Sequence, residues 1–226
     1  MLNETVNKCT DDLLQTLKAE KFQNNDENKI GILPKNCSAE CNAITLGIGM
    51  DVKAEKDLLK MLPQCKFIGV DPDPDKSGKP FIEVTKGKYI EGAVGVSAGF
   101  YNSTVLKKNA YKKEVLQHYS LKELLSQNFK DNQIIDFLFM DIEGAEFELI
   151  EDLINNPNEY PTICQINVEF HDPNEHKGGK RFFQSIVKSV KEKVYLPIKV
   201  DPLMKYSFNR IFFMNINEIC LNKFYI

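Results

Sequence analysis

The segment Ile134–Met140 constrains the fold more than any other part of the sequence, because it is apolar at every position except Asp136. Its length suits a β-strand and is short for a helix. A strand that is apolar almost throughout is buried on both faces, and such strands occur mainly in parallel sheets covered by helices on both sides. The segment therefore predicts a central strand of a parallel α/β sheet.

Strand and helix patterns alternate on both sides of this segment, which is typical of a doubly wound, Rossmann-like sheet. A helix at 121–129 begins with a capping box, Ser120 followed by Glu123. We expect a helix and an arm over residues 1–42, with a loop at 23–42, and the sheet domain over residues 43–226. An irregular insert at 97–119 and the last strand pair are expected to cover the binding pocket. Strands are predicted at 43–47, 66–70, 89–96, 134–140, 162–170, 194–200 and 209–215, and further helices at 4–22, 52–62, 145–155 and 181–193.

The overall composition excludes several classes of protein. The chain has 226 residues and a net charge of −3, and a chain of this length can bury a core without metal or disulfides. A weakly acidic chain is poorly suited to bind nucleic acid, which requires a basic surface. No apolar run approaches the ~18 residues needed to cross a membrane. These features predict that neither nucleic acid nor a membrane is a partner.

The N-terminus and the cysteines bear on the compartment. The first twenty residues contain Glu4, Asp11 and Asp12 and have no apolar core, unlike a secretory signal. The six cysteines are too sparse for a disulfide scaffold, and we expect Cys65 and Cys164, at or in predicted strands, to be buried thiols. The chain is therefore predicted to be intracellular, in the cytoplasm; a longer secreted parent chain is the alternative.

Ligands of doubly wound sheets bind at the carboxyl ends of the strands, so the residues there are the candidates for a site. The strand at 43–47 ends in Gly47-Ile48-Gly49, where two glycines permit a tight turn and a close approach of a ligand to the backbone. The next strand ends in Asp71, a carboxylate able to accept hydrogen bonds from ribose hydroxyls. This pattern predicts a nucleoside cofactor; a tight turn followed by an Asp-Pro turn is the alternative.

Charge near these two strand ends discriminates between nucleoside cofactors. A nicotinamide dinucleotide carries a pyrophosphate, which binds at a helix N-terminus. The third glycine of its fingerprint would fall at Val52, and Asp51, Asp71, Asp73 and Asp75 add negative charge where the pyrophosphate would lie. S-adenosylmethionine has no phosphate and carries a sulfonium cation, which suits an acidic rim. The charges therefore favour S-adenosylmethionine.

Acidic residues also follow the fourth and fifth strands. Asp141 and Glu143 come after the strand at 134–140, and Glu169 and His171 close the strand at 162–170. Side chains alternate along a strand, so Glu169 and His171 point to the same side. Glu143 also fits a role at the start of the following helix, where acids complement the helix dipole. Asp141 lies at the strand end itself, where the ligand is expected.

The block Asp141-Ile142-Glu143-Gly144-Ala145-Glu146 resembles the FkbM-type methyltransferases, whose fourth strand runs into a similar sequence. Phe67–Pro72 resembles the acid-proline pair at the second strand end of that family. Ser120–Leu125 resembles the helix before its fourth strand, and Val168–His171 resembles its fifth strand end. The resemblance spans roughly residues 44–214, and Thr45–Gly49 resembles a divergent animal branch of the family.

This resemblance implies a seven-stranded methyltransferase sheet with an antiparallel strand near the C-terminus. It implies O-methyl transfer from S-adenosylmethionine to a small hydroxylated molecule or a sugar. By the same resemblance, Gly47 and Gly49 line the methionine part of the cofactor and Asp71 binds its ribose. Asp141 and Glu143 lie on the methyl side of the pocket.

Two positions depart from the family pattern. Thr45 stands where methyltransferases commonly have an acid, and Asp51 stands where the loop of the family has a later glycine. These departures leave open a second function, a non-catalytic binding or scaffold domain that keeps the fold. A dinucleotide-dependent oxidoreductase is a third, disfavoured by Val52 and the acidic rim.

Transfer to an alcohol also requires a base, which accelerates such a step by ~10²–10⁴. The candidates are Asp141 and His171, and the unperturbed pKa of histidine, about 6.5, suits a base at neutral pH. A structural hydrogen-bonding role is the alternative for His171, and His118 and His176 are weaker candidates. No metal is predicted, but Asp141, Glu143, Glu169 and His171 could also form an oxygen-rich site for Mg²⁺ or a similar cation.

Overall fold

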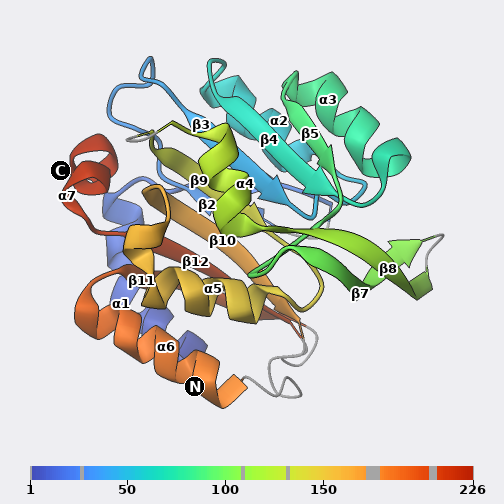
Figure 1. The fold of residues 1–226 in the computed structure, drawn as a ribbon. Helices are drawn as coiled ribbons and strands as arrows, with labels where there is room; N and C mark the ends of the chain where they lie inside the picture. The colour runs from blue at the N-terminus through green and yellow to red at the C-terminus, as the bar shows by residue number, and fades with distance from the viewer. Residues whose placement is uncertain are drawn as a thin grey trace.

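The strand predicted at 134–140 is confirmed as β9 (Ile135–Met140), which is buried at all its positions inside a seven-stranded sheet. The computed structural model describes residues 2–25, 28–107, 110–130, 133–171, 179–203 and 208–225. The strands lie in the order β11-β12-β10-β9-β3-β4-β5 (Figure 1). The remaining strands of this sheet are β3 (Asn42–Leu46), β4 (Lys66–Asp71), β5 (Lys88–Glu91), β10 (Ile163–His171), β11 (Tyr195–Leu203) and β12 (Phe208–Asn215).

The strand directions confirm the predicted fold class. β10, β9, β3, β4 and β5 are parallel to one another, and β12 is antiparallel to both β10 and β11. Within β9, Phe137 and Phe139 join the core on one face of the sheet, and Leu138 and Met140 join the core on the other. The nearly continuous apolar run therefore reflects burial between two layers, as expected for a doubly wound sheet.

Helices cover both faces of the sheet (Figure 1). The core on one face includes side chains of α4 (Leu121–Asn128), α5 (Glu146–Asn155) and α6 (Gly179–Glu192), and the other core includes those of α2 (Lys53–Met61) and α3 (Lys79–Thr85). Ser120 caps α4 as predicted, since its hydroxyl accepts a hydrogen bond from the Glu123 amide at 3.5 Å. None of the described helices is long and apolar enough to cross a membrane. Short helical turns form η1 (Pro74–Gly78), η2 (Pro157–Glu159), α7 (Glu218–Cys220) and η4 (Leu221–Tyr225).

The N-terminal segment differs from the predicted helix and loop. Helix α1 (Leu2–Thr16) ends earlier than expected, because Lys18 adopts a left-handed conformation with φ of 51°. A hairpin follows, made of β1 (Glu20–Gln23) and β2 (Asn28–Gly31). Phe22, which the helical pattern included, is completely buried against the rings of Phe137 and Phe139. A strand at this position packs the Phe22 ring on the sheet better than another helical turn would.

Two amide side chains on β10 hold the end of this hairpin over the sheet. Asn167 accepts a hydrogen bond from the Ile30 amide and donates one to the Ile30 carbonyl, both at 2.7 Å. Gln165 makes the same pair of bonds to Ile32, at 2.7 and 2.9 Å. The side chains thus bind the backbone of the hairpin much as a neighbouring strand would.

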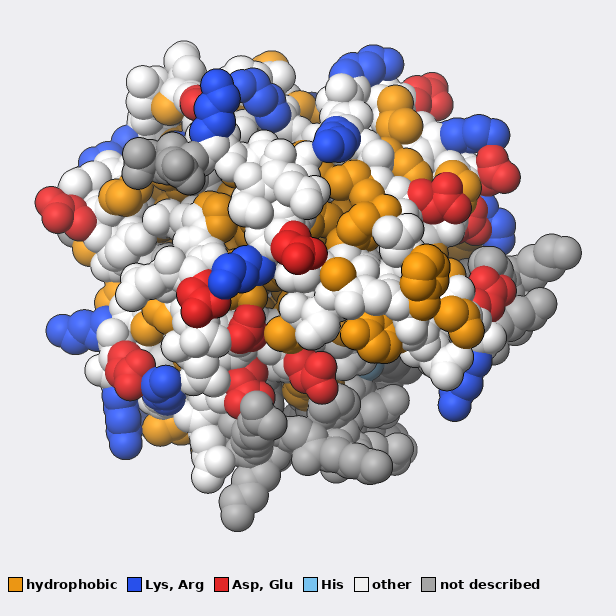
Figure 2. Space-filling view, in the orientation of Figure 1, with side chains coloured by type: hydrophobic (Ala, Val, Ile, Leu, Met, Phe, Trp, Pro, Cys, Tyr) orange, Lys and Arg blue, Asp and Glu red, His pale blue; other side chains and the backbone are white. Residues whose placement is uncertain are grey.

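The insert at 97–119 is also more regular than expected. It forms the long hairpin of β7 (Gly99–Lys107) and β8 (Ala110–Ser120), which β6 (Ala93–Gly95) extends to a three-stranded sheet. The strand predicted at 89–96 is therefore two strands, β5 and β6, separated by Gly92 with φ of 147°. The hairpin projects from the main sheet (Figure 1), and on that side of the molecule hydrophobic side chains gather at the surface (Figure 2).

The two cysteines expected to be buried thiols are buried, but both form disulfides, so that prediction was wrong. Cys65 pairs with Cys41 and Cys164 pairs with Cys220, with Cα–Cα distances of 4.4 and 5.4 Å. The register of β3 against β4 sets Asn42 beside Lys66, and this brings the preceding Cys41 next to Cys65. A disulfide requires two cysteines that lie close together. The sequence does not show which strands are neighbours, so it could not predict this pair.

Candidate active site at the carboxyl ends of the strands

The structure brings the glycine loop and the acidic block into direct contact. The amide of Asp141 donates to the Leu46 carbonyl at 2.9 Å, and Gly47 follows with φ of 73°. A Cβ atom at Gly47 would lie 1.7 Å from the carbonyl oxygen of Asp141, so no other residue fits there without displacing the backbone. The end of β3 and the end of β9 are therefore locked together.

Gly49 has a similar backbone but different surroundings. Its φ is 65°, and a Cβ atom built there would meet nothing within 4 Å. The glycine thus leaves open space beside a left-handed backbone, at a strand end where ligands of such sheets bind. An approaching cofactor would find the Gly49 side of this loop open.

Asp71 lies at the end of β4, as predicted, and it organises the loop. Its carboxylate accepts hydrogen bonds from the amides of Ile48 and Gly49 at 3.0 Å and from the Asp73 amide at 2.8 Å. Burial raises the pKa of Asp71, and these hydrogen bonds oppose the shift. The side chain is 7% exposed. Its role toward a ribose stays a prediction, and its acceptor positions are largely occupied by the chain itself.

A carboxylate from a neighbouring helix lies beside Thr45, the position at which methyltransferases commonly have an acid. The Thr45 hydroxyl donates to Glu55 at 2.9 Å, and Glu55, in the first turn of α2, is 1% exposed. A buried carboxylate from the helix thus lies beside the strand position where methyltransferases commonly have an acid. Glu55 lies three residues before Leu58 on the buried side of α2, and a charge on an apolar helix face is the signal that could have revealed it.

His171 is the centre of an acidic cluster at the ends of β9 and β10. Its Nε2 lies 3.4 Å from Asp141 Oδ1, 3.5 Å from Glu143 Oε2 and 3.8 Å from Glu169 Oε1. The predicted candidates Asp141, Glu143, Glu169 and His171 are therefore brought together. The side chains of Asp141 and Glu143 are 38% and 29% exposed, so the cluster opens to solvent on their side.

Glu146 fixes the orientation of the His171 ring. It is completely buried, and its Oε1 lies 3.0 Å from the ring Nδ1 and accepts a hydrogen bond from the His171 amide at 2.8 Å. Burial by itself would lower the pKa of His171, but the bond to Glu146 and the charges of Glu146, Asp141 and Glu143 raise this pKa to about 9. The argument for His171 as a base rested on an unperturbed pKa, and the cluster removes that argument by favouring positive charge at the imidazole.

The turn between β9 and α5 is strained where it carries Glu143. This residue has φ of 57° and the following Gly144 has φ of 116°. The Gly144 amide donates to Glu146 at 2.6 Å, which holds the turn. A non-glycine residue in this region costs about 1–2 kcal/mol, and such strain is found at functional sites. The turn directs the Glu143 carboxylate toward His171.

Arg210 on β12 is a further member of the cluster that the sequence analysis did not identify. It forms an ion pair with one carboxylate oxygen of Glu169, and the other oxygen of Glu169 faces His171. A small hollow of about 20 Å³ lies beside this pair, lined also by Lys29 and Asn167. The register of β10 against β12 sets Arg210 opposite Glu169, and only the fold reveals that pairing.

The other two histidines were weaker candidates. His118 lies on β8 in the three-stranded sheet, with the ring of Tyr101 at 5.2 Å, and burial lowers its pKa. His176 lies outside the residues that the structure describes.

Comparisons with known proteins identify the family. No curated protein matched the sequence. Among solved structures, the METTL16 methyltransferase domain has 12% identity and a TM-score of 0.44; the match covers 80% of this chain and 62% of that one, less than two thirds of its length. Aeropyrum pernix fibrillarin, in complex with S-adenosyl-L-methionine, has 11% identity and a TM-score of 0.44 over 88% of this chain and 84% of that one. The Methanococcus jannaschii fibrillarin pre-rRNA processing protein has 9% identity and a TM-score of 0.48 over the same shares.

A model of the methyltransferase FkbM domain matches residues 12–197, which is most of the chain. This match agrees with the family suggested by the block at Asp141–Glu146. The chain belongs to the FkbM family of S-adenosylmethionine-dependent methyltransferases.

Proposed function

We propose that this chain transfers a methyl group from S-adenosylmethionine to a hydroxyl of a small molecule or a sugar. The observation that carries the proposal is the convergence of Asp141, Glu143 and Glu169 on His171, in a cluster that packs directly against the Gly47 turn. An acidic cluster beside an open glycine loop suits a cationic cofactor, and family membership supports the same donor.

The residues present fit this cofactor. Gly49, with open space beside its backbone, would contact the methionine part, and Glu55 supplies negative charge near the same loop for an ammonium group. Asp71 and the acids that follow it would face the ribose. When bound, the cofactor supplies a methyl group that is already activated by its sulfonium charge. The chain has then to align the acceptor, and alignment of this kind lowers a barrier by about 7–11 kcal/mol in favourable cases.

Asp141 is the residue that we assign as the base. Its side chain is 38% exposed, whereas that of His171 is 11% exposed, so an acceptor hydroxyl reaches Asp141 more easily. The Asp141 carboxylate would accept the proton of the acceptor hydroxyl, and the cofactor, when bound, would supply the methyl group and leave as a neutral thioether. His171 contacts Asp141, Glu143 and Glu169 and serves as a positioning residue that holds the carboxylates in place.

The disulfides bear on the compartment of the reaction. Disulfides persist in oxidising compartments and are rare in the cytosol. The pairs Cys41–Cys65 and Cys164–Cys220 therefore favour an oxidising compartment over the cytoplasm predicted from the sequence. This proposal agrees with the alternative of a longer secreted parent chain.

Calorimetric titration with S-adenosylmethionine, with NADH as the control ligand, tests the first step of the proposal. Binding of S-adenosylmethionine alone supports the cofactor site, and methyl transfer to a panel of sugars and small alcohols then tests the reaction. Asp71→Asn is the informative variant for the ribose, because alanine would leave three loop amides without their acceptor. Binding of neither ligand would contradict the proposal.

The second candidate function is a non-catalytic domain that keeps the fold. Thr45, in place of the usual strand acid, is the observation that favours it. Tight binding of S-adenosylmethionine without transfer to any acceptor in the panel would support this candidate over the enzyme.

A further inference from the structure

A contact at Nδ1 fixes the orientation of the His171 ring, and Nε2 is then directed at three carboxylates. Nδ1 is held at 3.0 Å by Glu146, which is completely buried and also binds the amides of Gly144 and His171. A carboxylate behind a histidine is the usual outer partner of a metal-binding imidazole, because it fixes the tautomer and the ring orientation. Glu146 is thus engaged behind the ring, and Nε2 faces Asp141, Glu143 and Glu169.

The distances around Nε2 suit donors that share an ion. They are 3.4, 3.5 and 3.8 Å, longer than the 2.7–3.2 Å or so that is typical of an N–H···O hydrogen bond. Metal–donor bonds to nitrogen and oxygen are about 2.1 Å, which separates neighbouring donors by about 3.0 Å at right angles and about 3.4 Å in a tetrahedron. Asp141, Glu169 and His171 each offer a donor atom within 4.8 Å of the others. A small contraction would bring these atoms to bonding distance of one ion.

The charge and the backbone of the cluster also favour a cation. Four carboxylates lie within 4 Å of the two ring nitrogens of His171, whereas one contact with Arg210 is made at Glu169. Two of the donors are anchored on strand ends, and Glu143 is held by a left-handed turn. The donors are therefore arranged before any ligand arrives, and within the described part of the chain four carboxylates surround this imidazole.

We propose that Asp141, Glu169 and His171 bind one divalent cation of the first transition row, which displaces the proton from His171 Nε2, with Glu143 as a further oxygen donor. Mixed imidazole and carboxylate donors suit ions such as Mn²⁺, Fe²⁺ and Zn²⁺. Binding of the ion does not depend on the proposed methyl transfer. Its consequence for the substrate rests on that proposed function: an ion at this position would select acceptors with two adjacent oxygens, such as diols, and orient one of them toward the methyl group.

Titration of the full chain with Mn²⁺, followed by calorimetry and by the loss of the free-ion electron paramagnetic resonance signal, tests the proposal. We expect one bound ion per chain in the micromolar range. Asp141→Asn and Glu169→Gln keep the shapes of the side chains and should each weaken binding at least tenfold. Glu83→Gln, an exposed carboxylate on α3 outside the cluster, is the matched control and should leave Mn²⁺ binding unchanged.

Glu146→Gln provides a further check, because loss of the outer carboxylate typically weakens metal binding by about 10–100-fold. Thermal melting of each variant without the ion shows whether the fold is retained. The proposal is overturned if no stoichiometric binding is seen up to 1 mM Mn²⁺, a concentration about a thousandfold above the expected micromolar range. It is also overturned if Asp141→Asn and Glu169→Gln both bind Mn²⁺ as tightly as the wild type does. Titration with S-adenosylmethionine in the presence of a chelator separates this failure from a failure of the methyltransferase function.

Discussion

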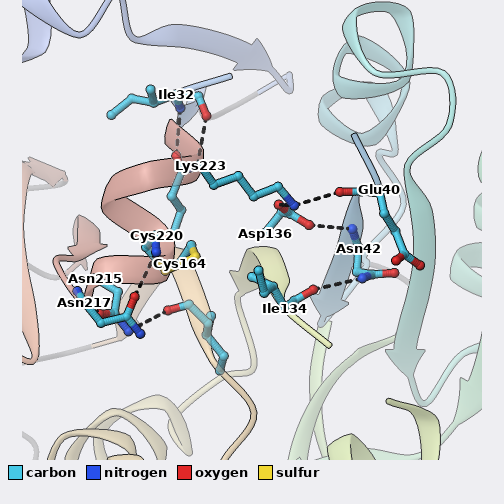
Figure 3. The surroundings of a disulfide bond; sticks show 12 residues. Ile32, Glu40, Asn42, Ile134, Asp136, Cys164, Asn215, Asn217, Cys220 and Lys223 are labelled. Carbon is cyan, nitrogen blue, oxygen red and sulfur yellow. Dashed lines mark hydrogen bonds and ion pairs between the residues drawn. A yellow bond between two sulfur atoms is a disulfide. The ribbon is translucent and has the colours of Figure 1, made fainter. Parts of the chain in front are cut away.

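The two ends of the parallel strands have been built in different ways. At the amino ends the chain is fastened by covalent and ionic links: one disulfide joins the starts of β3 and β4, and the other joins β10 to α7. Between them Lys223 forms an ion pair with the buried Asp136 and donates to the Glu40 carbonyl at 2.7 Å (Figure 3). Asn42, which also binds Asp136, completes this edge.

At the carboxyl ends the chain instead has left-handed turns and a cluster of carboxylates. Gly47, Gly49, Glu143 and Gly144 all have positive φ, and the carboxylates around His171 lie close to one another. The left-handed backbone of Glu143 and the proximity of like charges both cost stability. The difference teaches that the covalent and ionic links lie at one edge of the sheet, and the proposed binding site at the other, where ligands of such sheets bind.

The sharpest test of this division is Asp141→Asn. We expect methyl transfer to fall by ~10²–10⁴ because the base is lost, while the free energy of unfolding stays within about 0.5 kcal/mol, as for most substitutions of exposed side chains. Transfer is measured with labelled S-adenosylmethionine and an acceptor from the panel, and stability by urea unfolding. Unchanged transfer would remove Asp141 from the mechanism, and a large loss of stability would break the division between the edges.

The opposite test removes the disulfide at the amino edge with Cys164→Ser and Cys220→Ser together. The free energy of unfolding should fall by about 2–4 kcal/mol because the unfolded chain gains freedom. Cys164 and Cys220 are 56 residues apart in sequence, and Cys41 and Cys65 are 24 residues apart. Removal of the Cys41–Cys65 disulfide should therefore lower the free energy of unfolding by about 0.7 kcal/mol less than removal of the Cys164–Cys220 disulfide. Urea unfolding measures both. The affinity for S-adenosylmethionine should not change; a tenfold loss of affinity would show that the edges are coupled.

A matched pair of substitutions sharpens the comparison within the carboxyl edge. Gly47→Ala should destabilise the chain more than Gly49→Ala by about 1–3 kcal/mol, because only the first forces a methyl group into a filled space. Both share the cost of a left-handed backbone, about 1–2 kcal/mol. Thermal unfolding measures the difference. Gly49→Ala should in turn weaken S-adenosylmethionine binding, and equal affinity of this variant and the wild type would mean that the cofactor does not approach there.

The smallest expected effect concerns Glu55. Glu55→Gln removes the charge beside the first loop and should weaken S-adenosylmethionine binding about tenfold, which corresponds to about 1.4 kcal/mol. The exposed Glu83 on α3, changed to glutamine, is the control of equal charge change. Calorimetric titration gives both affinities. An equal effect of the two variants would assign the loss to net charge and not to the position of Glu55.

The parts of the fold that depend on local pattern could be predicted from the sequence. The apolar run of β9, the capping serine of α4 and the glycines after β3 each carry their signal within a few residues. The acidic block at Asp141 and the pair Glu169 and His171 were likewise recognised from strand ends. These features follow from periodicity and backbone preference, and none of them requires a partner from elsewhere in the chain.

The features that the sequence analysis missed depend on contacts between distant segments. Phe22 continued the helical pattern of α1, yet it is buried by the phenylalanines of β9. Arg210 meets Glu169 only through the register of β10 and β12, and Cys41 meets Cys65 only through that of β3 and β4. The pKa of His171 on β10 depends on Glu146, Asp141 and Glu143, which follow strand β9. Tertiary packing decides all of these.

The contact between Gly47 and Asp141 changes how related sequences should be compared. Any descendant that keeps this packing must retain glycine at the first position, whether or not it still catalyses a reaction. Retention of Gly47 therefore reports ancestry of the fold. Gly49 has room for a side chain, so the proposed cofactor site implies that lineages which no longer bind the cofactor would lose this glycine and keep Gly47.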